Sequence, residues 1–73
     1  MRNPASVYCV EDKGGQLEIV RLPSGGEVGI CTLPDGEIVE EWTLYRRDKG
    51  LMDHIRPELR DEIQAAIEEI RNR

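Results

Sequence analysis

The stretch that decides the fold is 9-CVEDKGGQLEIVRLPSGGEVGICTLPDGEIVEEW-42. Three runs rich in β-branched and other apolar residues cover 16–22, 27–33 and 37–45. Short turns of glycine and proline separate them, at residues 23–26 and 34–36. Runs of this kind joined by short turns are typical of antiparallel hairpins. The sequence therefore predicts a three-stranded antiparallel meander.

The second turn sets the register of the sheet. If it is a three-residue loop, Leu33 pairs with Glu37 and Cys31 pairs with Val39. Alternation along the strands then assigns the apolar residues to two faces. One face carries Gly29, Cys31, Leu33, Val39 and Tyr45, and the other carries Val28, Ile30, Ile38, Trp42 and Leu44. Because both faces are apolar, both need cover.

Two helices can supply that cover. Asn3 followed by Pro4 predicts a helix start, with the helix over residues 4–12 and a stop at the following glycine pair. After a connector at 51–56, Pro57 begins a second helix. Its apolar residues recur at the helical spacing, at Leu59, Ile63, Ala66, Ile67 and Ile70. The fold class is thus α+β, with an N-terminal helix, the meander and a C-terminal amphipathic helix whose stripe joins the core. A homodimer through that helix is the alternative.

The length and the charge of the chain limit the functions that it can have. A chain of 73 residues forms one small domain with a marginal core, so a covalent staple or a partner is expected. The net charge is −5, and the first 42 residues hold eight acids against three bases. Such a domain repels phosphate backbones, so we do not expect a nucleic-acid partner. The candidate contact surface is the acidic stretch of Asp35, Glu37, Glu40 and Glu41, with a solvated hairpin edge as the alternative.

The sequence carries little catalytic chemistry. His54 is the only histidine, and with two cysteines it makes neither a zinc set nor a nucleophile pair. Cys9 as a nucleophile is disfavoured by the neighbouring Glu11 and Asp12, which oppose thiolate formation. No apolar run is long enough to span a membrane. We therefore predict no catalytic residues, no metal, no cofactor and no membrane insertion.

The order of several short motifs resembles a known family. The motifs are NPASVYC at residues 3–9, Gly14-Gly15, Gly29-Ile30-Cys31, Pro34-Asp35-Gly36, Glu40-Glu41-Trp42 and Arg46. Over residues 3–49 the chain resembles a small bacterial domain of unknown function whose members commonly carry a hemolysin label. Residues 50–73, the connector and last helix of the single domain 1–73, lie outside the resemblance.

The resemblance implies short exported or lipid-anchored proteins of the cell envelope. No leader precedes Asn3, so either a leader was removed from a periplasmic or extracellular protein, or the protein is cytoplasmic. Where many members carry two further cysteines, this chain has Val39 and Lys49, so the resemblance implies that Cys9 and Cys31 are partners. Because Cys31 faces Val39 in the expected register, another pairing in those members is an alternative, and an intracellular location is another explanation of the fewer cysteines. The helix folding back on the sheet also favours a Cys9–Cys31 disulfide, with two buried thiols as the alternative.

We therefore expect a non-catalytic, envelope-associated binding or interaction module whose partner is an unknown protein or envelope component. Two alternatives remain. The family label implies a small hydrolase or lytic factor, and the amphipathic helix allows a dimerising structural domain.

Overall fold

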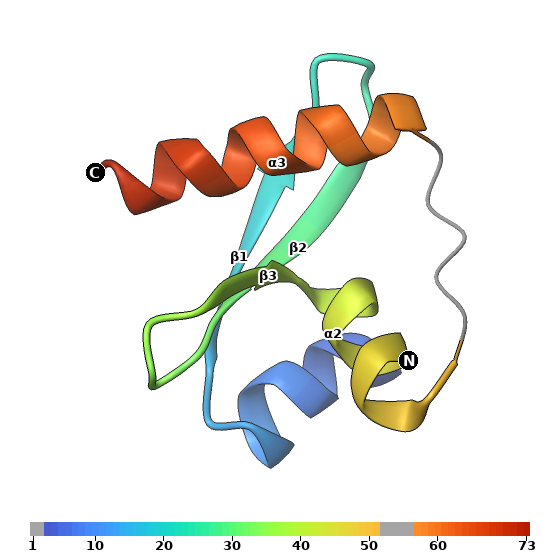
Figure 1. Ribbon diagram of the computed structural model, residues 1–73, viewed down its shortest axis with the longest axis vertical. Coiled ribbons are helices and arrows are strands. Elements are labelled where there is room, and N and C mark those ends of the chain that lie inside the picture. Colours follow the sequence, from blue (N-terminus) through green and yellow to red (C-terminus); the bar gives the residue numbers. More distant parts are fainter. Residues whose placement is uncertain (1–2, 52–56) are drawn as a thin grey trace.

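The computed structural model describes residues 3–51 and 57–73. The elements are α1 (Pro4–Val7), η1 (Tyr8–Asp12), β1 (Gln16–Arg21), β2 (Glu27–Thr32), β3 (Ile38–Glu40), α2 (Glu41–Lys49) and α3 (Pro57–Arg71) (Figure 1). This confirms the α+β class with an N-terminal helix, a three-stranded antiparallel sheet and a C-terminal helix. Residues 52–56 of the expected connector, His54 among them, lie outside the described residues.

The N-terminal helix begins as its sequence predicts. The Oδ1 atom of Asn3 accepts hydrogen bonds from the backbone amides of Ala5, at 2.8 Å, and Ser6, at 3.4 Å. Pro4 occupies the first turn, where its missing N–H costs nothing. The helix widens to π-helical geometry in η1 and ends before Gly14, whose φ of 68° an L side chain rarely adopts.

The sheet has the order β1-β2-β3, and the predicted second hairpin is confirmed. Cys31 lies opposite Val39, and the amide of Leu33 donates to the carbonyl of Glu37 at 2.8 Å. Asp35 Oδ1 accepts from the amide of Glu37 at 2.9 Å, which fixes the turn. The turn chemistry therefore sets the register.

The third strand is shorter than the sequence predicts. It ends at Glu40 instead of continuing to residue 45, and the chain enters α2 at once. Glu40 caps this helix, since its carboxylate accepts from the amides of Trp42, at 2.9 Å, and Thr43, at 3.0 Å. Gly50 closes the other end in the left-handed conformation, with φ 72°. Capping at both ends therefore outweighs the strand preference of residues 42–45.

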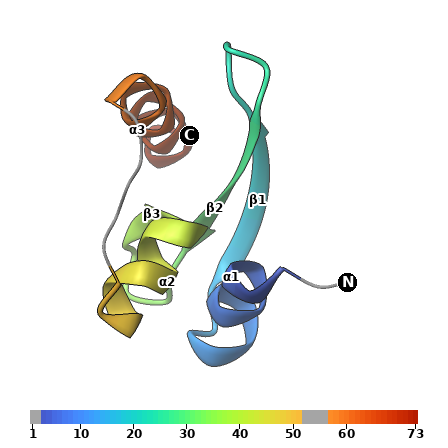
Figure 2. The ribbon, with the colours of Figure 1, turned by 90° about the vertical axis from the view of Figure 1, so that its right-hand side faces the viewer.

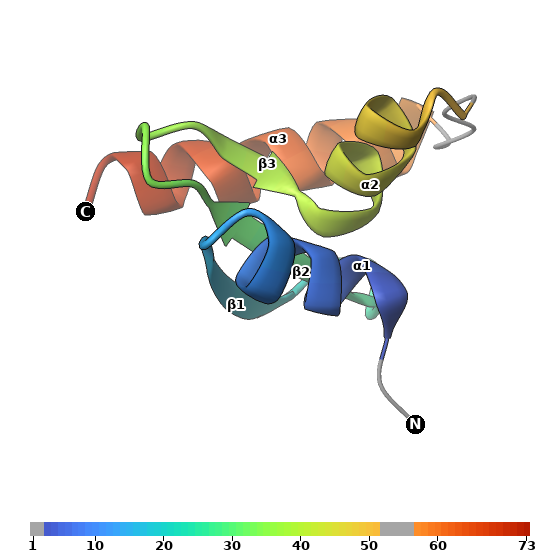
Figure 3. The same ribbon diagram turned by 90° about the horizontal axis from the view of Figure 1, so that it is seen from below.

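Two apolar cores lie on opposite faces of the sheet. In Figures 2 and 3, α3 crosses one face while α1 and η1 lie against the other, with α2 next to them. The first core consists of Cys9, Cys31, Leu33, Val39 and Leu44, with Tyr8 and Leu17 packed against it. The second consists of Leu22, Ile30, Ile63 and Ile67, with Val20, Val28, Ile38, Leu59 and Ile70 around it. Both faces are thus covered, as expected.

The helical conformation of α2 corrects three side-chain assignments. Leu44 was expected on the sheet face of Ile30, yet it is fully buried in the first core. Trp42 and Tyr45 project from α2 and are half-buried. The apolar stripe of α3 packs against this chain's own sheet, so a homodimer through α3 would have to use another surface of the helix.

Candidate binding surface

A buried disulfide joins the N-terminal helix to the sheet. It links Cys9 in η1 to Cys31 in β2, with the two Cα atoms 6.1 Å apart and both residues fully buried. Gly15 lies against it, since an added Cβ there would be 2.8 Å from the Sγ of Cys31. The expected bridge is present, and a bridged sulfur is not a thiolate nucleophile.

Glu41 links α2 to α1 from the interior. Its side chain lies at the start of α2, and the residue is only 4% exposed. Asn3 Nδ2 donates to Oε1 at 3.1 Å, and Ser6 Oγ donates to Oε2 at 2.6 Å. Gly29 in β2 provides the space, because an added Cβ would be 2.5 Å from Oε2. We call these four residues the Glu41 node: Glu41, Asn3, Ser6 and Gly29. The node joins α2, α1 and β2 in one structural contact.

Two of the four residues of the predicted acidic contact surface are buried. Glu40 is 4% exposed and is consumed in capping α2, and Glu41 is equally buried. Only Asp35 and Glu37 of that group are exposed. Glu37 accepts two hydrogen bonds from the guanidinium of Arg47, at 2.7 and 3.3 Å. The four acids thus serve turns, caps and ion pairs rather than one shared face.

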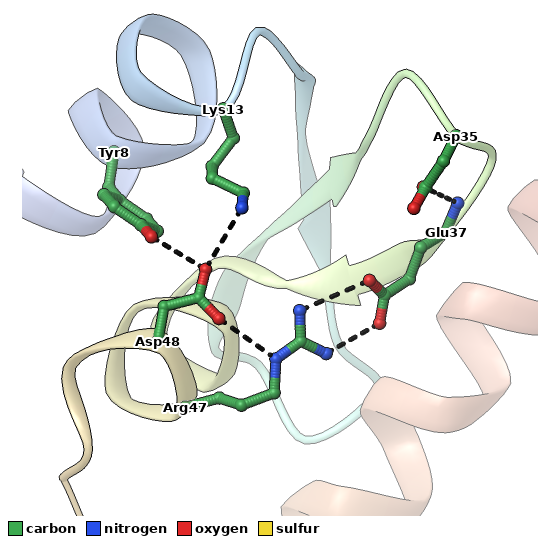
Figure 4. A network of polar contacts seen from close by, with 6 residues as sticks. All are labelled: Tyr8, Lys13, Asp35, Glu37, Arg47 and Asp48. Carbon is green, nitrogen blue, oxygen red and sulfur yellow. Dashed lines mark hydrogen bonds and ion pairs between the residues drawn. The ribbon is translucent and has the colours of Figure 1, made fainter.

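A polar network at the surface connects η1, the hairpin and α2 (Figure 4). Asp48 accepts from the hydroxyl of Tyr8 at 2.7 Å and from Arg47 Nε at 3.3 Å, and Lys13 Nζ lies 3.4 Å away. The hydrogen bond from Tyr8, followed by those from Arg47 and Lys13, lowers the pKa of Asp48 below its ordinary value. The same carboxylate raises the pKa of the Tyr8 hydroxyl. The hydrogen bond to Glu37 raises the pKa of Arg47, so this guanidinium stays charged.

A second surface feature, which shares Tyr8 with this network, was not predicted from the sequence. We call it the aromatic–cation surface, and it consists of Tyr8, Trp42, Tyr45, Arg46 and Lys49. The ring of Tyr45 meets those of Tyr8 and Trp42 edge to face, each with centroids 5.7 Å apart. Arg46 lies 5.6 Å from the centre of the Trp42 ring, and Lys49 lies 5.1 Å from that of Tyr8 and 5.8 Å from that of Tyr45. All three rings are half-buried, so each keeps an exposed part.

The described ranges, 3–51 and 57–73, hold neither a metal-ligand cluster nor a membrane-spanning helix. Within them, no three His, Cys, Asp or Glu side chains gather closely enough to hold a metal ion. None of the described helices is both long and apolar enough to cross a membrane.

Comparison with known sequences places this arrangement in a family. Residues 1–48 match the profile of a domain of unknown function, DUF333. The chain belongs to this family. The match includes the disulfide, the Glu41 node and all of the aromatic–cation surface except Lys49. The DUF333 description does not contain the hemolysin label that the resemblance suggested.

The curated relatives have no assigned role. The uncharacterized protein YoaF of Escherichia coli K12 is 52% identical over 48 residues, which cover 66% of this chain and 55% of YoaF. YoaF of Shigella flexneri matches equally. An uncharacterized protein of Archaeoglobus fulgidus is 48% identical over 46 residues, which cover 63% of this chain and 21% of that protein. The chain thus spans about half the length of the YoaF relatives, and no solved structure matches it.

Proposed function

We propose that this chain is a non-catalytic binding module of the cell envelope, and that its aromatic–cation surface binds an anionic envelope component. The observation that carries the proposal is the continuous surface of three aromatic rings with two cations on them. Tyrosine and tryptophan offer an apolar body with a polar end, which suits recognition of partly apolar ligands. Cations beside such rings add attraction for negative charge.

Charge distribution supports an anionic ligand. The chain carries a net charge of −5, yet the last turn of α2 holds Arg46 and Lys49 in addition to Arg47, which is paired with Glu37 and Asp48. Cations at a helix C-terminus are favoured by the helix dipole, so they can be concentrated there at low cost. Arg46 and Lys49 thus place positive charge beside the aromatic rings of an acidic domain, and such charge attracts anions.

The rigidity of α2 also supports a binding role. Glu40 caps the helix, Glu41 ties it to α1, and Leu44 buries it in the disulfide-containing core. A surface held in place before binding loses little conformational entropy on binding. The disulfide agrees with an oxidising location such as the envelope, because disulfides persist there.

Vesicle co-sedimentation tests this proposal. Wild-type protein is expected to sediment with vesicles that contain phosphatidylglycerol but not with vesicles of phosphatidylcholine alone. The double substitution Arg46→Glu with Lys49→Glu should abolish sedimentation. The matched control, Arg60→Glu with Arg71→Glu, makes the same net charge change on two exposed residues of α3 and should leave sedimentation intact. A dye trapped in the vesicles should stay inside, because no insertion is expected.

Soluble polyphosphate provides the second arm. Binding to polyphosphate without binding to vesicles would identify an anionic polymer rather than a lipid headgroup as the ligand. Binding to neither probe, or equal binding by wild type and the double variant, would overturn the proposal.

A further inference from the structure

We infer that the sheet face beneath α3 is a docking surface for an amphipathic helix, and that α3 is its tethered, exchangeable occupant. The DUF333 match ends at residue 48, and α3 spans Pro57–Arg71, so α3 lies outside it. The sheet residues that α3 covers, in contrast, all lie inside the match. This inference does not depend on the proposed function.

The covered face would be unsuitable as a free surface. Leu22 and Ile30 are 3% and 1% exposed, and Val20, Val28 and Ile38 surround them. A contiguous apolar patch of this kind marks an interaction site when it is not covered. The matched unit fills 55% of YoaF and 21% of the Archaeoglobus fulgidus protein, so it occurs joined to different remaining sequence. The face thus lies inside the family unit, and α3 lies outside it.

The two cores make α3 separable. The first core, with the disulfide, is formed by η1, the sheet and α2, and among the described residues α3 contributes nothing to it. The Glu41 node is formed by the first part of the chain as well. The unit before α3 therefore holds its own tertiary contacts, and α3 adds the second core.

Two open hollows flank α3 at the surface, while Ile63 and Ile67 beneath it are each 7% exposed. A hollow of about 260 Å³ lies between α3 and β3 with its continuation into α2, lined by residues that include Ile38, Thr43 and Gln64. Another of about 170 Å³ lies on the side of β1, beside Val20 and Ala65. Where a hollow flanks the helix, the side of the helix has no packing neighbour. The helix therefore lies across the face without being enclosed by it.

Polar contacts at the surface link α3 to the first hairpin of the sheet. Glu62 accepts from the backbone amide and the hydroxyl of Ser24, each at 2.8 Å. Arg73, just beyond the last turn, donates twice to Glu18, at 2.8 and 2.7 Å. The ion pair between Arg73 and Glu18 is exposed, so water screens it and it contributes little to stability. The two hydrogen bonds from Ser24 also lie at the surface. They orient a helix on the face more than they retain it.

These contacts define the partner. It is an amphipathic helix with branched aliphatic residues at i, i+4 and i+7, as Ile63, Ile67 and Ile70 are placed in α3. A carboxylate just before the first of them meets Ser24, and a cation ten residues after it meets Glu18. This spacing is the usual pattern of helix-in-groove recognition.

A full-chain variant with Ile63→Asp and Ile67→Asp tests the inference against a fluorescent peptide of residues 57–73. The variant should bind the peptide saturably and at least roughly tenfold more tightly than wild type, because the tethered α3 of wild type competes at high effective concentration. The fluorescence of Trp42, which lies on α2, should show that the first core stays folded. A peptide with the same two aspartates is the matched control and should not bind.

Amide hydrogen exchange of the wild-type chain is a second test of whether α3 undocks separately. If α3 undocks separately, its amides should exchange at least about tenfold faster than those of β2. Equal protection of α3 and β2 would overturn the inference. So would unfolding of the double variant, or a folded variant that does not bind the peptide.

Discussion

Replacing Gly29 with alanine is expected to destabilise the domain, because this glycine makes room for the Glu41 carboxylate. An alanine Cβ would lie 2.5 Å from Glu41 Oε2 and 2.6 Å from its Cδ, which is too close for any real contact. The carboxylate must therefore move. Moving it breaks or lengthens its hydrogen bonds with Ser6, now 2.6 Å, and Asn3, now 3.1 Å.

The magnitude follows from those two hydrogen bonds. A hydrogen bond to a charged group contributes about 1.5–3 kcal/mol, and a buried group left unpaired costs a similar amount. We expect Gly29→Ala to lower the free energy of unfolding by about 2–4 kcal/mol, allowing for partial rearrangement. Urea unfolding followed by the fluorescence of Trp42, the residue after Glu41, measures this difference.

A double-mutant cycle isolates the cause. In a Glu41→Ala background the carboxylate is absent, so adding Gly29→Ala should cost less than about 0.5 kcal/mol. An equal loss in both backgrounds would refute the reasoning, because the cost would then come from the strand backbone and not from the carboxylate.

Three further predictions concern the Cys9–Cys31 disulfide, the Glu40 cap of α2 and the hydrogen bonds of Asp48. Replacing Cys9 and Cys31 together by alanine should lower the free energy of unfolding by roughly 3 kcal/mol in the chain-entropy model for a separation of 22 residues, and an unchanged urea midpoint would contradict this. Glu40→Ala should cost about 0.5–2 kcal/mol and reduce far-ultraviolet helical ellipticity by loss of the α2 cap; full ellipticity and stability would show that the cap is dispensable. The folded pKa of Asp48 lies below its ordinary 3.8, chiefly through the hydroxyl of Tyr8, so its stabilising contribution is complete above that value and is lost as the pH falls through the folded pKa. In the Asp48→Asn variant, the free energy of unfolding should therefore fall less steeply as the pH is lowered below about 4. An unchanged pH dependence would exclude this contribution.

The hairpins could be read from the sequence because their turns carry specific backbone chemistry. Gly36, which ends the Pro34-Asp35-Gly36 turn, has a φ of 96°, a value that strongly favours glycine. That turn fixes Cys31 opposite Val39, and the two apolar faces follow from alternation. The N-terminal helix and α3 were likewise predictable, from Asn3 and Pro57 at their starts.

The end of β3 could not be read in the same way. Glutamate is not among the residues preferred at a helix N-cap, and residues 42–45 include a tryptophan and a tyrosine that favour strands. The sequence did indicate a helix at the other end of this segment, where Arg46, Arg47 and Lys49 precede Gly50. Basic residues followed by a glycine are typical of a helix C-terminus. In a strand, Trp42 and Tyr45 would point to opposite faces, whereas three residues apart on a helix they are neighbours. The aromatic–cation surface was missed for this reason.

We propose that the chain binds anions through the aromatic–cation surface. A nitrogen-15 chemical-shift titration with a soluble short-chain phosphatidylglycerol, repeated with polyphosphate, tests it most directly. We predict saturable shifts at Tyr8, at the Trp42 indole and through residues 45–50, with little change at Asp35 and Glu37. Shifts centred on the Asp35–Glu37 turn, or no saturable shift with either probe, would contradict the claim.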